Sequence, residues 1–377
     1  MTGNYTVTPA QGHLRCYGKA VKQEHLHDNP LELVQRFSLS HPKIDRYKAR
    51  LLGWRTDSGE YGAWTGFLAH KYGPQRTCLS LGSGTGRVEQ QLLETGFASQ
   101  FDAIEISDSL NAEVDRSGSN IETRQGDLNF CQLPANTYDF ILCHQILHHL
   151  INIEHVLDQI NNALAPSGLL LVSEYIGENR WQFSEDRLGY LRSAFPDIPL
   201  KRIPLWRVDG FESVRSGDLR HLIKAQFGNS CEQSVDFGGA YFPYAVSSWS
   251  RAMPFIDQIL EQDEIVSKQN MLNPCYHIGL YRKSNAPPVK AIPWTDDDLR
   301  RRLIAEVSGI EHVKALAYRL RKRVRLRSRL YMLGVSLHRG KLRVATESQR
   351  KDMPLIARRG LRSPLGKTGK AKQKLKI

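Results

Sequence analysis

The sequence predicts an α/β fold in the middle of the chain, with a parallel, doubly wound, twisted sheet and helices on both faces. Short apolar segments alternate there with amphipathic helical segments, which is the pattern of strand–helix–strand units. A glycine-rich loop joins the first strand to its helix, and polar residues follow the later strands. The expected strands are 77–81, 101–106, 138–143 and 169–174, and the helices between them are 87–95, 109–115 and 153–163.

Further elements are expected after the fourth strand. An irregular segment is followed by a helix, a strand, a second helix and a last strand, at 175–214, 217–226, 231–237, 250–267 and 276–282. We divide the chain into an N-terminal helical cap (1–60), a main domain (61–283) with a substrate-side insertion at about 175–250, a proline-rich linker (284–294), a basic helical extension (295–362) and a lysine-rich tail expected to be disordered (363–377).

The net charge of +13 is concentrated at one end of the 377-residue chain. Residues 313–377 carry 21 Lys or Arg and two acids, whereas residues 1–312 carry 31 bases and 37 acids. The body of the protein is therefore mildly acidic, and the high isoelectric point of the whole chain does not by itself indicate nucleic-acid binding.

Cysteine usage and hydropathy indicate a cytoplasmic protein. The six cysteines form no CxxC or CxxxC pair, so we expect free thiols rather than a disulfide framework or a cysteine metal cluster. No apolar run approaches the roughly 20 residues of a spanning helix. The first eighteen residues lack the basic-then-apolar order of a secretory signal.

The loop after the first strand reads LGSGTGR, with Gly82, Gly84 and Gly86 at every second position. It lacks the Lys-Ser/Thr pair of a phosphate-binding P-loop, and Arg87 stands where a dinucleotide fingerprint needs a small residue. Glycines at these positions allow positive φ and let a ligand approach the backbone. Taken alone, the loop is also compatible with a tight turn that binds nothing.

Two acids make a ligand site the better interpretation. Glu105 ends the next strand, where a carboxylate can accept hydrogen bonds from two ribose hydroxyls. Asp127, in Gly126-Asp-Leu-Asn, follows a third strand-like piece. Because the carboxyl ends of parallel strands meet at one edge of an open sheet, the loop and both acids are expected to lie together there.

With these pieces in order, the chain resembles class I S-adenosylmethionine-dependent methyltransferases of Rossmann-like fold over about residues 45–283. The matching segments are LGSGTG, IEIS, GDLN, YDFILCHQILHHL and LAPSGLLLVSEYIG. The segments EYIGENRWQF and FESVRSGDLRHLI further resemble a bacterial subgroup with an EYxGxxRxQ signature, although Glu178 stands where that subgroup usually has proline.

The resemblance implies the cofactor S-adenosylmethionine and a set of residues around it. The glycine loop should line its methionine end, Glu105 its ribose, and Asp127 with Leu128 its adenine, while His144 and Gln145 should face the methionine side. The full set of expected cofactor-binding residues is Gly82, Ser83, Gly84, Gly86, Glu105, Ile106, Asp127, Leu128, His144 and Gln145.

Methyl transfer depends mainly on alignment and exclusion of water, and a base is needed when a hydroxyl acceptor must lose its proton. We expect His149, in the pair His148-His149, to be that base, with Glu174 as the alternative. The resemblance also allows the histidine pair a structural role at the entry of the following helix. Glu174 could instead hold a loop by hydrogen bonds. The acceptor pocket is expected to be shaped by Tyr175, Arg180, Trp181 and Gln182. Alternatively, these residues serve only to pack a lid over the site. No metal site is expected.

The sequence thus favours methylation, and specifically O-methylation, of a small-molecule or sugar-containing acceptor. The absence of an NPPY-like tetrapeptide lowers the case for nucleobase methylation. The apolar stripe at 313, 316, 317, 320 and 324, flanked by arginines, could lie on the anionic inner face of a membrane, contact nucleic acid, or be a solvated extension. The alternatives are an RNA-modifying or RNA-binding protein and a non-catalytic cofactor-binding module.

Overall fold

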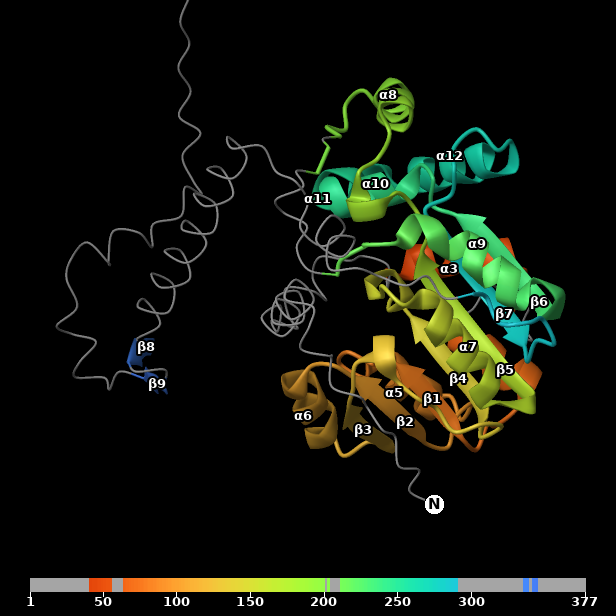
Figure 1. The fold of residues 1–377 in the computed structure, drawn as a ribbon. Coiled ribbons are helices and arrows are strands. Elements are labelled where there is room, and N and C mark those ends of the chain that lie inside the picture. Colours follow the sequence, from red (N-terminus) through yellow and green to blue (C-terminus); the bar gives the residue numbers. More distant parts are fainter. Residues whose placement is uncertain are drawn as a thin grey trace, which may run out of the picture. The chain divides into compact units, whose positions relative to one another are not determined.

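The computed structural model describes residues 41–55, 64–200, 202–203 and 211–290, together with two short strands at 335–338 and 341–344. The chain divides into two units, residues 1–306 and 307–377, and each is described by itself. The first contains a seven-stranded sheet in the order β3-β2-β1-β4-β5-β7-β6 (Figure 1). Its strands are β1 (Cys78–Leu81), β2 (Phe101–Glu105), β3 (Ile121–Gln125), β4 (Tyr138–His144), β5 (Leu164–Tyr175), β6 (Cys231–Phe237) and β7 (Tyr276–Arg282).

The sheet is mostly parallel, as predicted. Strands β1 to β5 pair in parallel, and β7 runs antiparallel to both of its neighbours, β5 and β6. All four residues of β1 are buried, which suits a central strand covered on both faces. The edge strand β6 alternates between partly buried and exposed residues instead.

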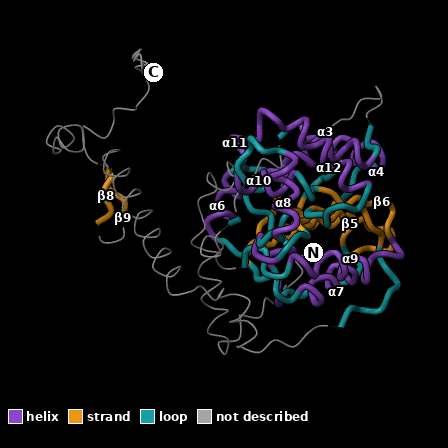
Figure 2. The backbone as a smooth tube through the Cα atoms, turned by 90° about the horizontal axis from the view of Figure 1, so that it is seen from above, coloured by secondary structure: helices purple, strands orange, loops and turns teal. Residues whose placement is uncertain are grey.

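Helices cover both faces of the sheet (Figure 2). Buried side chains of α7 and α9 form a core on one face, and those of α3, α4, α5, α6 and α12 form a core on the other. The helices in the described part of this unit are α3 (Pro42–Leu52), α4 (Trp64–Tyr72), α5 (Arg87–Glu94), α6 (Asp108–Arg116), α7 (Ile153–Ala163), α8 (Glu185–Ala194), α9 (Ser216–Phe227), α10 (Tyr241–Ser247), α11 (Trp249–Ala252) and α12 (Ile256–Lys268).

Three predicted elements need correction. The single helix expected at 250–267 is split into α11 and α12 by a 3₁₀ turn at Met253–Phe255, because Pro254 cannot donate the backbone hydrogen bond that a continuous helix needs. The segment expected to be irregular contains α8, whose N-cap Ser184 accepts a hydrogen bond from the Arg187 backbone. Strand β5 begins at Leu164, five residues before the predicted start, because Leu164 already pairs with Tyr138.

The expected domain boundaries are only partly within the described residues. Of the predicted N-terminal cap, α3 packs Ile44 and Tyr47 into the core of the main domain. In the predicted helical extension, β8 (Val335–His338) and β9 (Lys341–Val344) form an antiparallel pair instead, in keeping with their alternation of apolar and polar residues. The rest of that extension and the lysine-rich tail lie outside the described residues. Among the helices that are described, none combines the length and apolarity needed to cross a membrane.

Candidate functional site

The carboxyl ends of β1, β2 and β4 lie side by side, because the register pairs Leu81 with both Ile104 and Cys143. The next residues along the three strands, Gly82, Glu105 and His144, therefore meet at one edge of the sheet. The glycine loop, residues 82–86, begins there, and the Gly82 N–H donates to the Ile104 carbonyl at 2.7 Å.

The three glycines of this loop serve different purposes. All have positive φ, at 68°, 55° and 69° for Gly82, Gly84 and Gly86. A Cβ on Gly82 would lie 2.4 Å from the Ile146 side chain, and one on Gly86 would lie 3.0 Å from Val114. A Cβ on Gly84 would meet no atom within 4 Å. Packing therefore requires the outer two glycines, while the middle one borders open space.

Glu105 is held against this loop. The side chain is buried, its Oε2 accepts from the Gly84 N–H at 3.0 Å, and its Oε1 accepts from the Ser107 N–H at 3.0 Å. A carboxylate has about four lone-pair positions, so two remain for ligand hydroxyls. Ile106 follows it and is partly buried.

Three buried polar atoms at this edge have no hydrogen-bond partner among the described residues: Ser83 Oγ, His144 Nδ1 and Gln145 Nε2. Buried polar atoms are normally paired, so unpaired ones that gather at a strand end indicate a place for a ligand. Burial, assisted by Lys48 and His148, lowers the pKa of His144 to about 3, which keeps its ring neutral. The Trp64 ring lies nearly parallel to it, at 6.5 Å between centroids.

Asp127 and Leu128 lie at the end of β3. Asp127 Oδ1 accepts from the backbone and side-chain N–H groups of Asn129, both at 3.0 Å, and so caps the short 3₁₀ helix Leu128–Phe130. Leu128 is buried. Asn129 in turn accepts two backbone N–H groups, at Ile151 and Asn152, which ties this edge to α7.

Glu174, at the end of β5, is completely buried and holds the loop after β4. Its Oε1 accepts from the backbone N–H groups of Ile146 and Leu147 at 2.7 and 2.8 Å, and its Oε2 contacts His148 Nδ1 at 2.8 Å. These contacts match the loop-holding alternative left open by the sequence. They also connect Glu174 to the glycine loop, because Ile146 packs against Gly82.

Strained backbone gathers around the same edge. Positive φ occurs at six described residues other than glycine, and two of these are asparagines, which tolerate it. The other four come from three segments of the chain: Gln145 (60°), Arg180 (58°), Trp181 (52°) and Ser213 (50°). Such strain persists only where the surroundings enforce it, and it is concentrated at functional sites.

Hydrogen bonds from Arg180 hold two parts of the insertion together. The Arg180 N–H donates to the Ser213 carbonyl at 2.8 Å, and Arg180 Nη1 donates to the Glu212 carbonyl at 3.1 Å. Tyr175 is buried, stacks on Phe242 at 4.6 Å and donates its hydroxyl to the Glu178 carbonyl. These positions correspond to the lid-packing alternative for the predicted acceptor residues.

The other two predicted acceptor residues, Trp181 and Gln182, also make packing or hydrogen-bond contacts with the protein itself. Gln182 donates to the carbonyls of Arg180 and Ile203 at 3.0 and 2.9 Å. Trp181 is partly buried and packs against the core on the side of α3 and α12.

The structure adds Glu212 to the candidate site. Its Oε1 lies 3.5 Å from His148 Nε2, and its Oε2 lies 3.7 Å from His149 Nε2. We call His148, His149 and Glu212 the histidine cluster. The sequence does not predict this contact, because Glu212 is far from both histidines along the chain.

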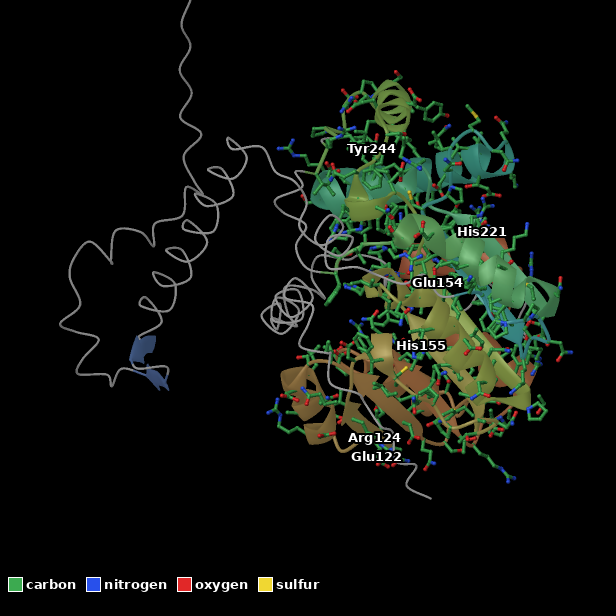
Figure 3. The ribbon with its side chains drawn as sticks, viewed as in Figure 1. Glu122, Arg124, Glu154, His155, His221 and Tyr244 are labelled. Carbon is green, nitrogen blue, oxygen red and sulfur yellow. The ribbon has the colours of Figure 1, made fainter. Side chains whose placement is uncertain are left out.

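A buried ion pair fixes the segment that carries Glu212. Arg215 and Glu154, both almost completely buried, form a two-pronged contact at 2.8 and 2.8 Å. Arg215 also donates to the Ile151 carbonyl and to Asp218. Glu154 belongs to the first turn of α7 (Figure 3), so the pair joins this helix to the start of α9.

Comparison with known proteins adds a family. A family model described as a methyltransferase domain matches residues 24–226. The chain is 22% identical over 153 residues to the highly reducing polyketide synthase acrA of Aspergillus aculeatus, a match that covers 37% of this chain and only 6% of that protein.

Solved structures similar to the chain include an S-adenosylmethionine-dependent methyltransferase from Mesorhizobium loti. That structure is 16% identical with a TM-score of 0.35, and the match covers 55% of this chain and 91% of the other. A putative sarcosine dimethylglycine methyltransferase from Galdieria sulphuraria is 14% identical with a TM-score of 0.37, and the match covers 59% and 86% of the two chains.

Proposed function

The chain belongs to the methyltransferase domain family and carries an S-adenosylmethionine-dependent methyltransferase domain, and from this premise we propose that it methylates an oxygen atom of a small-molecule or sugar-containing acceptor. The observation that supports a cofactor site most directly is the set of unpaired buried atoms on Ser83, His144 and Gln145, beside the open space at Gly84.

The residues at this edge fit the parts of S-adenosylmethionine. Ser83, His144 and Gln145 would hold the amino-acid end, which is rich in donors and acceptors. Glu105 would accept from the ribose hydroxyls, and Asp127 with Leu128 would border the adenine. When bound, the cofactor supplies an electrophilic methyl group on a positively charged sulfur.

An oxygen acceptor must lose a proton, and we propose that the histidine cluster receives it. His149 is the more exposed of its two histidines, with 26% of its side chain accessible against 6% for His148, so an acceptor can reach it. Glu174 is engaged on both oxygens and would position His148 rather than take part directly. An amine that is already neutral can attack without first losing a proton, whereas a hydroxyl must lose one, so a base at this position is more consistent with an oxygen acceptor.

The lid residues Tyr175, Arg180, Trp181 and Gln182 would shape the acceptor side indirectly, by holding the insertion closed over the sheet edge and excluding water. The narrower EYxGxxRxQ subgroup, a cytoplasmic location and a contact with anionic membrane belong to the same proposal. A basic tail that binds RNA is the rival interpretation, and it is tested with the membrane contact below.

Calorimetry with S-adenosylmethionine tests the cofactor site, using the wild type, Gly84→Asp and the matched control Gly118→Asp. Both glycines have positive φ and no atom within 4 Å of an added Cβ, but Gly118 lies beyond α6, before the amino end of β3. A carboxylate introduced at position 84 would fill the open space and repel Glu105. We expect at least tenfold weaker binding for Gly84→Asp and unchanged binding for Gly118→Asp.

An absence of binding by the wild type would refute the cofactor site. Equal affinities for all three proteins would place the cofactor away from the glycine loop. Turnover of labelled cofactor over a panel of hydroxyl and amine acceptors would then identify the acceptor atom, and methylation of amines alone would contradict O-methylation.

A further inference from the structure

We propose that Nε2 of His148, Nε2 of His149 and the carboxylate of Glu212 form a binding site for one divalent cation of the zinc type. The ligating atoms of these residues lie within 4.8 Å of one another. The sequence predicts no metal site, because no cluster of carboxylates and amides stands out in it.

The distances suit ligands of a shared cation better than direct hydrogen bonds. Glu212 lies 3.5 Å from one imidazole nitrogen and 3.7 Å from the other, beyond the usual range of about 2.7–3.2 Å for a hydrogen bond. Tetrahedral ligands placed about 2.1 Å from zinc are roughly 3.4 Å from each other. The two distances from the carboxylate to the imidazoles are therefore already close to those between ligands that share one ion.

His148 is already oriented as a ligand. Its Nδ1 lies 2.8 Å from Glu174 Oε2, and because a carboxylate accepts, Nδ1 is the donor of this contact, which leaves Nε2 on the side of Glu212 as the atom that can bind a cation. Glu174 is itself fixed by two backbone N–H groups. A carboxylate behind a histidine ligand is the usual outer support of zinc sites, where it fixes the tautomer and raises the basicity of the ring.

Hydrogen bonds also hold Glu212 in place. Its Oε1 accepts from Ser213 Oγ at 2.9 Å, and Arg180 binds the carbonyls of both Glu212 and Ser213. The strained φ of 50° at Ser213 is thereby maintained. Two imidazoles and one carboxylate favour zinc or a similar transition metal over magnesium or calcium, which prefer oxygen ligands. Three protein ligands also leave one position open.

The consequence for catalysis rests on the proposed function. A hydroxyl that occupied the open position would have a lowered pKa, as water does on zinc. His149 would then act as a ligand, and the cation would take over the task of acidifying the acceptor. The binding site itself can be tested without any acceptor.

The test uses the full chain after removal of metals with a chelator. Calorimetry with Zn²⁺ and visible absorption with Co²⁺ should show one equivalent bound in the wild type, with the intense bands of a tetrahedral site. We expect His149→Ala and Glu212→Gln to weaken binding at least 100-fold, and Glu174→Gln to weaken it about 10- to 100-fold. His221→Ala, an exposed histidine on α9 (Figure 3), should bind like the wild type.

Binding of S-adenosylmethionine by each variant checks that it is folded. The proposal is overturned if the metal-free wild type takes up no stoichiometric cation, or if folded Glu212→Gln binds it as tightly as the wild type. In either case normal cofactor binding would leave the proposed methyl transfer standing, with His149 as the base. Loss of cofactor binding alone would refute the proposed function and not the cation site.

Discussion

Glu89 is a buried carboxylate in the first turn of α5, directly after the glycine loop. Its Oε1 accepts from the Ser80 hydroxyl, while its Oε2 has no hydrogen-bond partner among the described residues. Burial is the main reason why the pKa of Glu89 is raised to about 7, partly offset by the Ser80 hydrogen bond.

This shift makes stability depend on pH. The folded protein holds the Glu89 proton more tightly than the unfolded chain, so its contribution to stability is complete below the unfolded pKa and is lost as pH rises through the folded value near 7. Glu89→Gln has no proton to lose. Between pH 5 and pH 8 we expect the free energy of unfolding of the variant to rise relative to the wild type by about 2 kcal/mol.

Urea unfolding of both proteins at the two pH values measures this difference. Glu94→Gln is the matched control, since Glu94 lies at the exposed end of the same helix. It should show no such change relative to the wild type. An equal pH dependence of wild type and Glu89→Gln would mean that Glu89 is charged in the folded protein at pH 7.

Single residues of the site were predictable where local sequence determines their place. Gly82, Glu105 and His144 follow directly from strand ends, which sequence patterns locate well. Glu212 was not predictable, because its contact with His149 depends on the path of a long insertion. The role of Glu174 was not predictable either, because its backbone partners at Ile146 and Leu147 follow a different strand.

At the scale of elements, the pairing of Arg215 with Glu154 should be important for stability. Both side chains are at most 2% exposed, so removing one would leave the other buried and uncompensated. We expect Arg215→Met to lower the free energy of unfolding by about 3–5 kcal/mol. The double variant Arg215→Met/Glu154→Leu should recover a large part of this loss, because no charge remains buried.

Chemical denaturation of the single and double variants gives these values. The control is Lys268→Met, which removes a surface ion pair with Glu264 in which Lys268 is 72% exposed, and which should cost less than about 1 kcal/mol. A small loss for Arg215→Met, similar to that of the control, would contradict a structural role for the buried pair.

Sequence patterns predicted most of the elements of the sheet but not those of the insertion. Helix α7 and strands β6 and β7 were predicted with their observed bounds, because apolar periodicity and breakers agree there. Helix α8 was missed although Ser184 followed by two acids is a start signal, since its weak amphipathicity hides the helix. The break between α11 and α12 is marked in the sequence by Pro254, which interrupts a continuous helix.

At the scale of the whole molecule, charge is distributed unevenly along the chain. The described catalytic unit lies within residues 1–306, and all of the basic excess lies in residues 313–377, because residues 1–312 carry more acids than bases. Because residues 1–312 are mildly acidic, they do not attract a polyanion. We propose that the basic segment determines where the enzyme acts and does not change how it binds its cofactor.

Cosedimentation with lipid vesicles tests our proposal that this segment holds the enzyme at an anionic membrane. We compare the full chain with a variant that lacks residues 313–377, on vesicles with and without anionic lipid. The full chain should bind anionic vesicles and should not bind neutral ones, because each basic residue near an anionic surface contributes about 1 kcal/mol. Binding to the anionic vesicles should weaken as the salt concentration rises.

Equal cofactor affinity of both proteins, measured by calorimetry, serves as the folding control. Negligible vesicle binding by both would refute the membrane proposal. Tight, steeply salt-dependent binding of RNA by the full chain alone would favour the RNA alternative instead. Because the two polyanions differ in shape and in aromatic bases, competition between RNA and anionic vesicles for the full chain decides which one the basic segment prefers.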